Sequence, residues 1–148
     1  MEIRELGPGD EALLERLDVD GEPSRPLAPD AAARFLADGR THLWAALEDG
    51  EPVGMLLAYE LPRRRGDETI VHVYEVGVAE PHRRRGVASA LWAALGARFP
   101  GVEAYVLVEE GNAPARTFYE AVGLAEPPER VVEYDGTLRS STPSDPSA

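Results

Sequence analysis

The sequence predicts an α+β fold in which a mixed central sheet is flanked by about four helices. Three observations lead to this prediction. Four segments carry apolar residues at helical spacing, three strand-like segments follow one another through short turns, and a helical segment then leads to a further apolar strand. Consecutive strands joined by short turns form an antiparallel meander, whereas a strand reached through a helix pairs in parallel.

The N-terminal part combines one short strand with two helices. EIREL, residues 2–6, alternates apolar and polar residues and predicts a strand. Asp10 is placed to cap a helix that carries leucines on one face. Residues 20–29 are rich in Pro and Gly and predict a loop, after which residues 30–38 predict a helix that stops at Gly39.

The middle of the chain predicts the antiparallel meander. Residues 41–47 and 52–61 read as a hairpin with Asp49-Gly50 at its tip, because glycine tolerates the positive φ that tight hairpin turns require. Residues 62–68 form a second turn, and the β-branched segment 69–78 follows as a long strand.

The C-terminal part supplies the crossover. The predicted elements, in chain order, are a helix over residues 87–98, a strand over 102–110, a helix over 113–123 and a last strand over 129–135. The tail, residues 139–148, is polar and rich in Pro and Ser, which predicts disorder. Residues 1–138 therefore form a single expected domain.

Composition narrows the class of protein. With 27 acidic and 15 basic residues, the 148-residue chain has a net charge of -12, which disfavours nucleic acid and anionic lipid and favours a cationic ligand. It has no cysteine, and its three scattered histidines lack the spacing of metal ligands, so we expect no metal. Neither a membrane span nor a signal peptide is evident, which predicts a cytoplasmic protein without a membrane partner.

One basic stretch interrupts this acidic chain. HRRRG, residues 82–86, lies between the strand 69–78 and the helix 87–98. A helix start offers unpaired N–H groups and a partial positive charge, and the arginines add charge-assisted hydrogen bonds, so this arrangement suits a phosphate group. The alternative is a solvated, charged turn.

At this point the chain resembles the GNAT acetyltransferase superfamily. Its [RQ]-x-x-G-x-[GA] signature corresponds to Arg83-x-x-Gly86-x-Ala88, and its second element corresponds to Asn112, Tyr119, Gly123 and Leu124 in GNAPARTFYEAVGL. The likeness covers about residues 2–135. LLAYELPR and VHVYEVGVAEPHRRRGVASAL are similar to the aminoglycoside 3-N-acetyltransferases of the type I family, although GNAPA departs from that pattern.

The resemblance implies the GNAT fold, with a splayed pair of parallel strands that admits acetyl-CoA. The implied cofactor-binding residues are Val76, Gly77, Val78, Arg83, Arg84, Arg85, Gly86, Val87, Ala88, Ser89 and Asn112. Gly77 lies in an otherwise β-branched strand, which indicates a bulge or a close backbone approach. Asn112 either bonds the cofactor or only caps the following helix.

The same resemblance assigns catalytic and acceptor residues. Tyr119 is the implied general acid for the leaving thiolate, the alternative being a tyrosine packed in the core. Glu75 is the implied base for the acceptor ammonium, the alternative being a solvent-facing carboxylate in an alternating strand. The expected acceptor groove contains Tyr74, Glu75, Glu109, Glu110, Glu133 and Asp135, though the last four are equally well explained as solvated charges.

The expected function is therefore an acetyl-CoA-dependent N-acetyltransferase that modifies an aminoglycoside, at the 3-amino group, and so confers antibiotic resistance. One alternative keeps the fold but acetylates another small cationic amine or a peptide N-terminus. A second alternative, of another class, is a non-enzymatic sensor that binds CoA. The resemblance also allows a homodimer.

Overall fold

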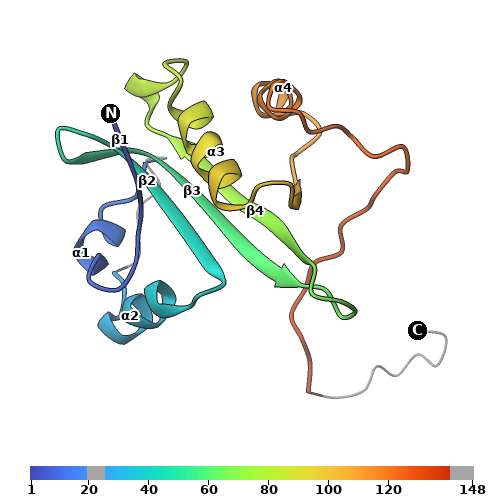
Figure 1. Ribbon diagram of the computed structural model, residues 1–148, viewed down its shortest axis with the longest axis horizontal. Coiled ribbons are helices and arrows are strands. Elements are labelled where there is room, and N and C mark those ends of the chain that lie inside the picture. The colour runs from blue at the N-terminus through green and yellow to red at the C-terminus, as the bar shows by residue number, and fades with distance from the viewer. Residues whose placement is uncertain (20–25, 141–148) are drawn as a thin grey trace.

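The fold is built on one five-stranded sheet with the strand order β1-β2-β3-β4-β5 (Figure 1). The computed structural model describes residues 1–19 and 26–140. Its strands are β1 (Glu2–Glu5), β2 (Thr41–Glu48), β3 (Glu51–Pro62), β4 (Thr69–Val78) and β5 (Glu103–Val106). Strands β1 to β4 pair antiparallel and β4 pairs with β5 in parallel, so the predicted mixed sheet is confirmed.

Four α-helices flank this sheet in the described part of the chain: α1 (Glu11–Leu14), α2 (Pro29–Ala37), α3 (Val87–Arg98) and α4 (Ala113–Ala121), with a short 3-10 helix, η1 (Glu80–His82). The predicted loop 20–29 lies partly outside the described residues, since 20–25 are not among them. Helix α1 is shorter than expected. Asp10 occupies its N-cap position, as predicted, but its side chain makes no capping hydrogen bond. That carboxylate instead pairs with Arg4 and accepts a hydrogen bond from the Gly7 N–H at 2.9 Å.

Two hydrophobic clusters form, one on each face of the sheet. Alternate residues of β2 enter each cluster: Leu43 lies with residues of α1 and α2, whereas Trp44 lies with residues of α3. This division follows from the period of two along a strand. Figure 1 shows α3 across the middle strands, with α1 and α2 near β1 and β2.

A close approach fixes the start of α3 against the sheet. A Cβ atom at Gly54 in β3 would lie 2.6 Å from the Cγ1 atom of Val87, the first residue of α3, and 3.2 Å from the Gly77 carbonyl oxygen. Only glycine permits this packing, because Val87 is itself buried and stiff at χ1. Residues 86–89 are thereby held beside β4.

The irregularity in β4 does not fall at Gly77, where the sequence placed it. Leu57 pairs with Glu75 and Ala58 pairs with Val73, so Tyr74 is the extra residue of a bulge, while Gly77 pairs regularly with Met55. Strand β5 pairs with β4 only over residues 70–73 and ends at Val106, well short of the predicted residue 110. The two parallel strands therefore separate at the bulge.

The predicted last strand, residues 129–135, is wrong. This segment contains no strand, and its apolar side chains are exposed: Val131 by 72%, Val132 by 65% and Tyr134 by 92%. A strand requires a partner edge, and residues 129–135 pair with none of the five described strands. Of the predicted tail 139–148, residues 141–148 lie outside the described part.

Candidate active site

The start of α3 presents unpaired backbone N–H groups. Gly86 precedes the helix in the left-handed conformation, with a φ of 83°, and no side chain bonds the first-turn amides. The N–H groups of Val87, Ala88 and Ser89 lie before the first intrahelical bond, which the Ala90 N–H donates to the Gly86 carbonyl at 3.0 Å. Arg84 also has a positive φ, 58°, and such turns aim successive amides at one point. The loop thus forms a concave anion site with the helix dipole behind it.

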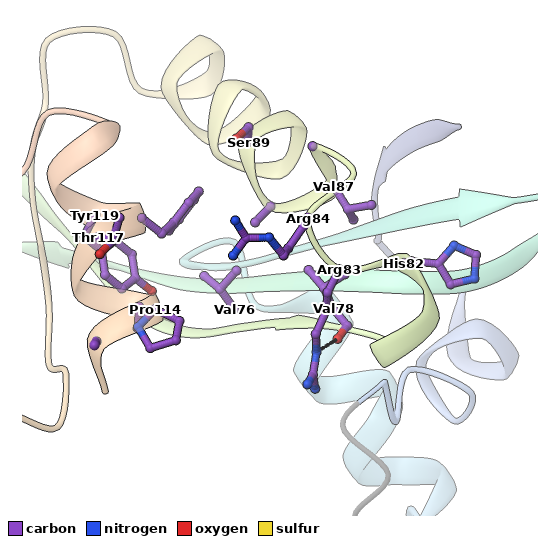
Figure 2. A pocket seen from close by; sticks show the side chains of 15 residues that line it. Val76, Val78, His82, Arg83, Arg84, Val87, Ser89, Pro114, Thr117 and Tyr119 are labelled. Atoms are coloured by element: carbon purple, nitrogen blue, oxygen red, sulfur yellow. Dashed lines mark hydrogen bonds between the residues drawn. The ribbon is translucent and has the colours of Figure 1, made fainter. Parts of the chain in front are cut away.

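This loop opens onto a cleft of about 600 Å³ between β4, α3 and α4 (Figure 2). Of the predicted cofactor-binding residues, the cleft is lined by Val76, Val78, Arg83, Arg84, Gly86, Val87, Ala88 and Ser89. The facing wall belongs to α4, through Ala113, Pro114, Ala115, Thr117, Phe118 and Tyr119. Of the residues on this wall, the sequence analysis predicted only Tyr119. The small residues in GNAPA could have indicated the others, because they leave room for a ligand at the start of α4.

The three consecutive arginines point in different directions. The Arg83 Nε–H donates to the Val78 carbonyl at 3.0 Å, and the Arg85 guanidinium lies 3.5 Å from the Glu48 carboxylate. Arg84 extends from its loop toward α4 (Figure 2), and within residues 1–19 and 26–140 it has no acidic partner. The Arg84 guanidinium is therefore placed to bind an anion in the cleft, whereas Arg85 is not among the residues that line it.

Tyr119 is packed against other aromatic rings and also lines the cleft. Its ring packs against Trp92 and Phe118 with centroid separations of 5.7 and 5.2 Å. Burial raises the pKa of Tyr119 above its usual value of 10.0. An unperturbed phenol is already protonated at neutral pH, and burial moves Tyr119 further from ionisation.

Asn112 acts as a helix cap. Its side-chain oxygen accepts a hydrogen bond from the Ala115 N–H at 3.2 Å, which satisfies one orphan donor of α4. Asn112 is not among the residues that line the cleft, although the next three residues are. Its influence on a ligand would therefore act through the position of the α4 start.

Strand β4 carries different residues on its two faces. Val76 and Val78 pack with the α3 cluster and line the cleft, and the buried Gly77 lies between them. The bulge turns both Tyr74 and Glu75 to the opposite, exposed side. There the pKa of Tyr59 is raised, mainly by burial and further by the charges of Tyr74, Glu75 and Asp38, which places Glu75 near Tyr59.

The four remaining predicted acceptor residues do not gather at this face. Glu109 and Glu110 are exposed in the loop between β5 and α4, and the Glu110 carbonyl accepts a hydrogen bond from Arg116 at 3.1 Å. Glu133 and Asp135 are exposed on the extended C-terminal segment, outside the cleft. Their part in an acceptor groove stays a prediction.

The described residues also bear on membrane and metal binding. Within the ranges 1–19 and 26–140, none of the helices has the length and apolar character that crossing a membrane requires. The same ranges contain no group of three or more His, Asp or Glu side chains that could hold a metal ion.

Comparison with protein families identifies this arrangement. The profile described as "Acetyltransferase (GNAT) family" matches residues 11–124, which include the cleft, the anion site and Tyr119. The chain belongs to the GNAT acetyltransferase family. Among curated proteins, none matches the sequence significantly.

Solved structures of GNAT proteins share the fold over almost the whole chain. An aminoglycoside acetyltransferase from an uncultured soil metagenomic sample, HMB0005, is 31% identical, with a TM-score of 0.80 over 93% of this chain and 98% of its own. A second soil metagenomic enzyme, meta-AAC0020 in complex with sisomicin, is 20% identical, with a TM-score of 0.83 over 93% and 96%. The aminoglycoside N-acetyltransferase AAC(6')-Iy, in complex with CoA, is 20% identical, with a TM-score of 0.71 over 93% and 100%.

The raised pKa of Tyr119 predicts an effect on alkaline stability. Burial favours the neutral phenol, so the neutral side chain contributes fully to the stability of the folded protein below the unfolded-state pKa of 10.0. This contribution is lost as the pH rises through the higher folded-state pKa. We expect Tyr119→Phe to reduce the fall in Tm between about pH 9 and about pH 11.5. Tyr134→Phe, at an exposed tyrosine, is the control and should leave the fall unchanged. Identical alkaline slopes for Tyr119→Phe and the wild type would contradict the burial argument.

Proposed function

We propose that this GNAT protein is an acetyl-CoA-dependent N-acetyltransferase that transfers an acetyl group directly to an amine of an aminoglycoside. The observation that carries the proposal is the uncapped start of α3, which opens with Arg84 onto a cleft large enough for an extended ligand. The enzyme HMB0005, at 31% identity over 93% of the chain, supports the substrate class. The CoA complex of AAC(6')-Iy supports the choice of cosubstrate.

The residues of the cleft fit acetyl-CoA. The N–H groups of Val87, Ala88 and Ser89 and the Arg84 guanidinium suit the diphosphate, which the rest of a chain with a net charge of -12 would repel. A Cβ atom built at Gly86 would have no described atom within 4 Å, so a ligand can approach the backbone of Gly86 closely. Val76 and Val78 provide an apolar wall for the pantetheine arm. Acetyl-CoA supplies the activated acetyl group as a thioester.

Two side chains, Glu75 of β4 and Tyr119 of α4, would then accept and donate the protons. Glu75 accepts a proton from the acceptor ammonium, directly or through water, so that the free amine attacks the thioester carbonyl. Tyr119 donates its phenolic proton to the departing sulfur. The chain contains no cysteine, so the commonest acyl-enzyme nucleophile is absent and direct transfer is the simplest route.

The 3-amino group is the proposed acceptor position, and drug resistance in the cytoplasm is the proposed consequence. The strongly acidic surface and Glu75 support a cationic acceptor, which an aminoglycoside shares with a polyamine or a peptide N-terminus. The alternatives are acetylation of one of those amines, or sensing of CoA without turnover.

Release of free CoA distinguishes these functions. Purified protein is mixed with acetyl-CoA and kanamycin, gentamicin, spermidine or a short basic peptide, and the thiol produced is measured. We expect turnover with the 2-deoxystreptamine drugs, and product NMR should place the acetyl group on the 3-amino nitrogen. Turnover restricted to spermidine or the peptide would show that the acceptor is another amine and not an aminoglycoside. CoA binding without thiol release would indicate a sensor.

Variants of Arg84 and Glu75 should affect the two substrates separately. Arg84→Ala removes a charge-assisted contact, so we expect KM for acetyl-CoA to rise about ten- to a hundredfold. Glu75→Gln should lower kcat/KM for the amine about a hundredfold or more, with KM for acetyl-CoA unchanged. Arg64→Ala, in the exposed turn between β3 and β4, is the control and should change neither constant. Normal turnover in Glu75→Gln would remove its assignment as the base.

The exposed C-terminal segment supports a homodimer. Val131, Val132 and Tyr134 are exposed, although residues 129–135 have a strand-like sequence. Strand β5 ends the sheet, and in the described part of the chain nothing pairs with its outer edge, which the same segment of a second copy suits. We expect light scattering to give about twice the 16.0 kDa chain mass, and truncation after residue 128 to give monomers. Removal of residues 139–148 alone is the control, and a full-length monomer would contradict the proposal.

A further inference from the structure

Four aromatic rings gather on the face of the sheet opposite the cleft. Tyr59, His72 and Tyr105 occupy directly paired positions on β3, β4 and β5, and Tyr74 joins them through the bulge. The His72 and Tyr105 rings are stacked, with centroids 4.4 Å apart and an interplanar angle of 15°. The Tyr74 ring stands nearly perpendicular to the rings of His72, at 5.9 Å, and Tyr59, at 5.5 Å. We call these four residues the aromatic platform.

The aromatic platform begins at the edge of the covered part of this face, where Tyr59 packs against the buried cluster, and continues to the exposed Tyr74 and Tyr105. The buried cluster under α1 and α2 draws its sheet residues from β2 and β3, and none from β4 or β5 in the described part of the chain. Tyr74 is 63% exposed and Tyr105 is 39% exposed. Large aromatic side chains left exposed together on one surface indicate a binding site.

The surroundings of the aromatic platform are acidic and incompletely satisfied. The charges of Glu75 and Asp38 act on Tyr59, so two carboxylates lie close to the rings. Arg63, near the same edge of the sheet, is paired with Glu103. The Nδ1 atom of His72 is covered and has no hydrogen-bond partner in the described residues.

We propose that the aromatic platform binds the acceptor as a cationic amino sugar, an inference that rests on the proposed function. The apolar C–H face of a sugar ring packs on exposed tyrosines, and its ammonium groups interact with the π faces and with Glu75. A linear polyamine offers charge without a ring face, so the platform favours the cyclic substrate. Because Tyr74 adjoins Glu75, a sugar held here brings its amine to the proposed base at the bulge.

Leucine substitutions on the aromatic platform test this assignment. Kanamycin is titrated calorimetrically into the full-length protein with CoA present, and steady-state constants are measured in parallel. Tyr74→Leu and Tyr105→Leu should each raise Kd and KM for kanamycin about five- to thirtyfold, the range that one cation–π contact supports. KM for acetyl-CoA should stay unchanged, and spermidine should be affected less than kanamycin.

Two further variants serve as controls. Tyr105→Phe retains the ring, so its Kd for kanamycin should stay within about twofold of the wild-type value. If the hydroxyl, and not the ring, were the part that matters, Tyr105→Phe would weaken binding as much as Tyr105→Leu does. Tyr134→Leu removes an exposed tyrosine from the C-terminal segment and should leave kanamycin binding unchanged. If Tyr105→Leu lowers Tm, the test rests on Tyr74→Leu, because Tyr74 is mostly exposed and its loss disturbs little packing.

The outcomes separate this inference from the proposed function. If Tyr74→Leu weakens kanamycin binding but the protein acetylates no amine, the result would support the platform and overturn the proposed function. Kanamycin acetylation with the same KM in Tyr74→Leu and the wild type would support the proposed function and overturn the platform. Absence of kanamycin binding to the wild type would also overturn the platform.

Discussion

The anion site at the start of α3 is the feature on which the rest of the account depends. Gly86 in the left-handed conformation begins a helix whose first amides have no side-chain cap, and they face a cleft rather than a buried neighbour. Gly54 holds this end of α3 against β3, because a side chain there would clash with Val87. In an acidic chain, backbone packing therefore sets the position of a helix start that suits an anion, while the neighbouring Arg83 is bound to the Val78 carbonyl.

The bulge at Tyr74 divides β4 into two functional faces. Beyond it, Val76 and Val78 line the cleft, and β5 no longer pairs with β4. At the bulge, Tyr74 and Glu75 both lie on the face opposite the cleft, where the aromatic platform is. In the proposed function, this extra residue would let the two substrates approach from opposite sides of the sheet and meet where the parallel strands separate.

The sequence could predict what depends on local chemistry. The Asp49-Gly50 turn has the expected positive φ values, 52° and 81°, and α3 begins and ends where HRRRG and Pro100 require. Features that depend on tertiary contacts were missed. The Asp10 side chain bonds Gly7 rather than capping α1, the bulge falls at Tyr74 because register decides it, and residues 129–135 find no strand edge within the monomer. Tyr59, His72 and Tyr105 meet only through strand pairing across three elements, which no local motif reveals.

Calorimetry that compares CoA with pantetheine tests the central claim most directly, because pantetheine keeps the thiol arm and lacks the diphosphate. If the α3 amides and Arg84 hold the diphosphate, CoA should bind the protein at least about a hundredfold more tightly than pantetheine, and the difference should shrink as salt is added. Equal affinity for the two ligands, or no heat with CoA at saturating concentration, would contradict the account.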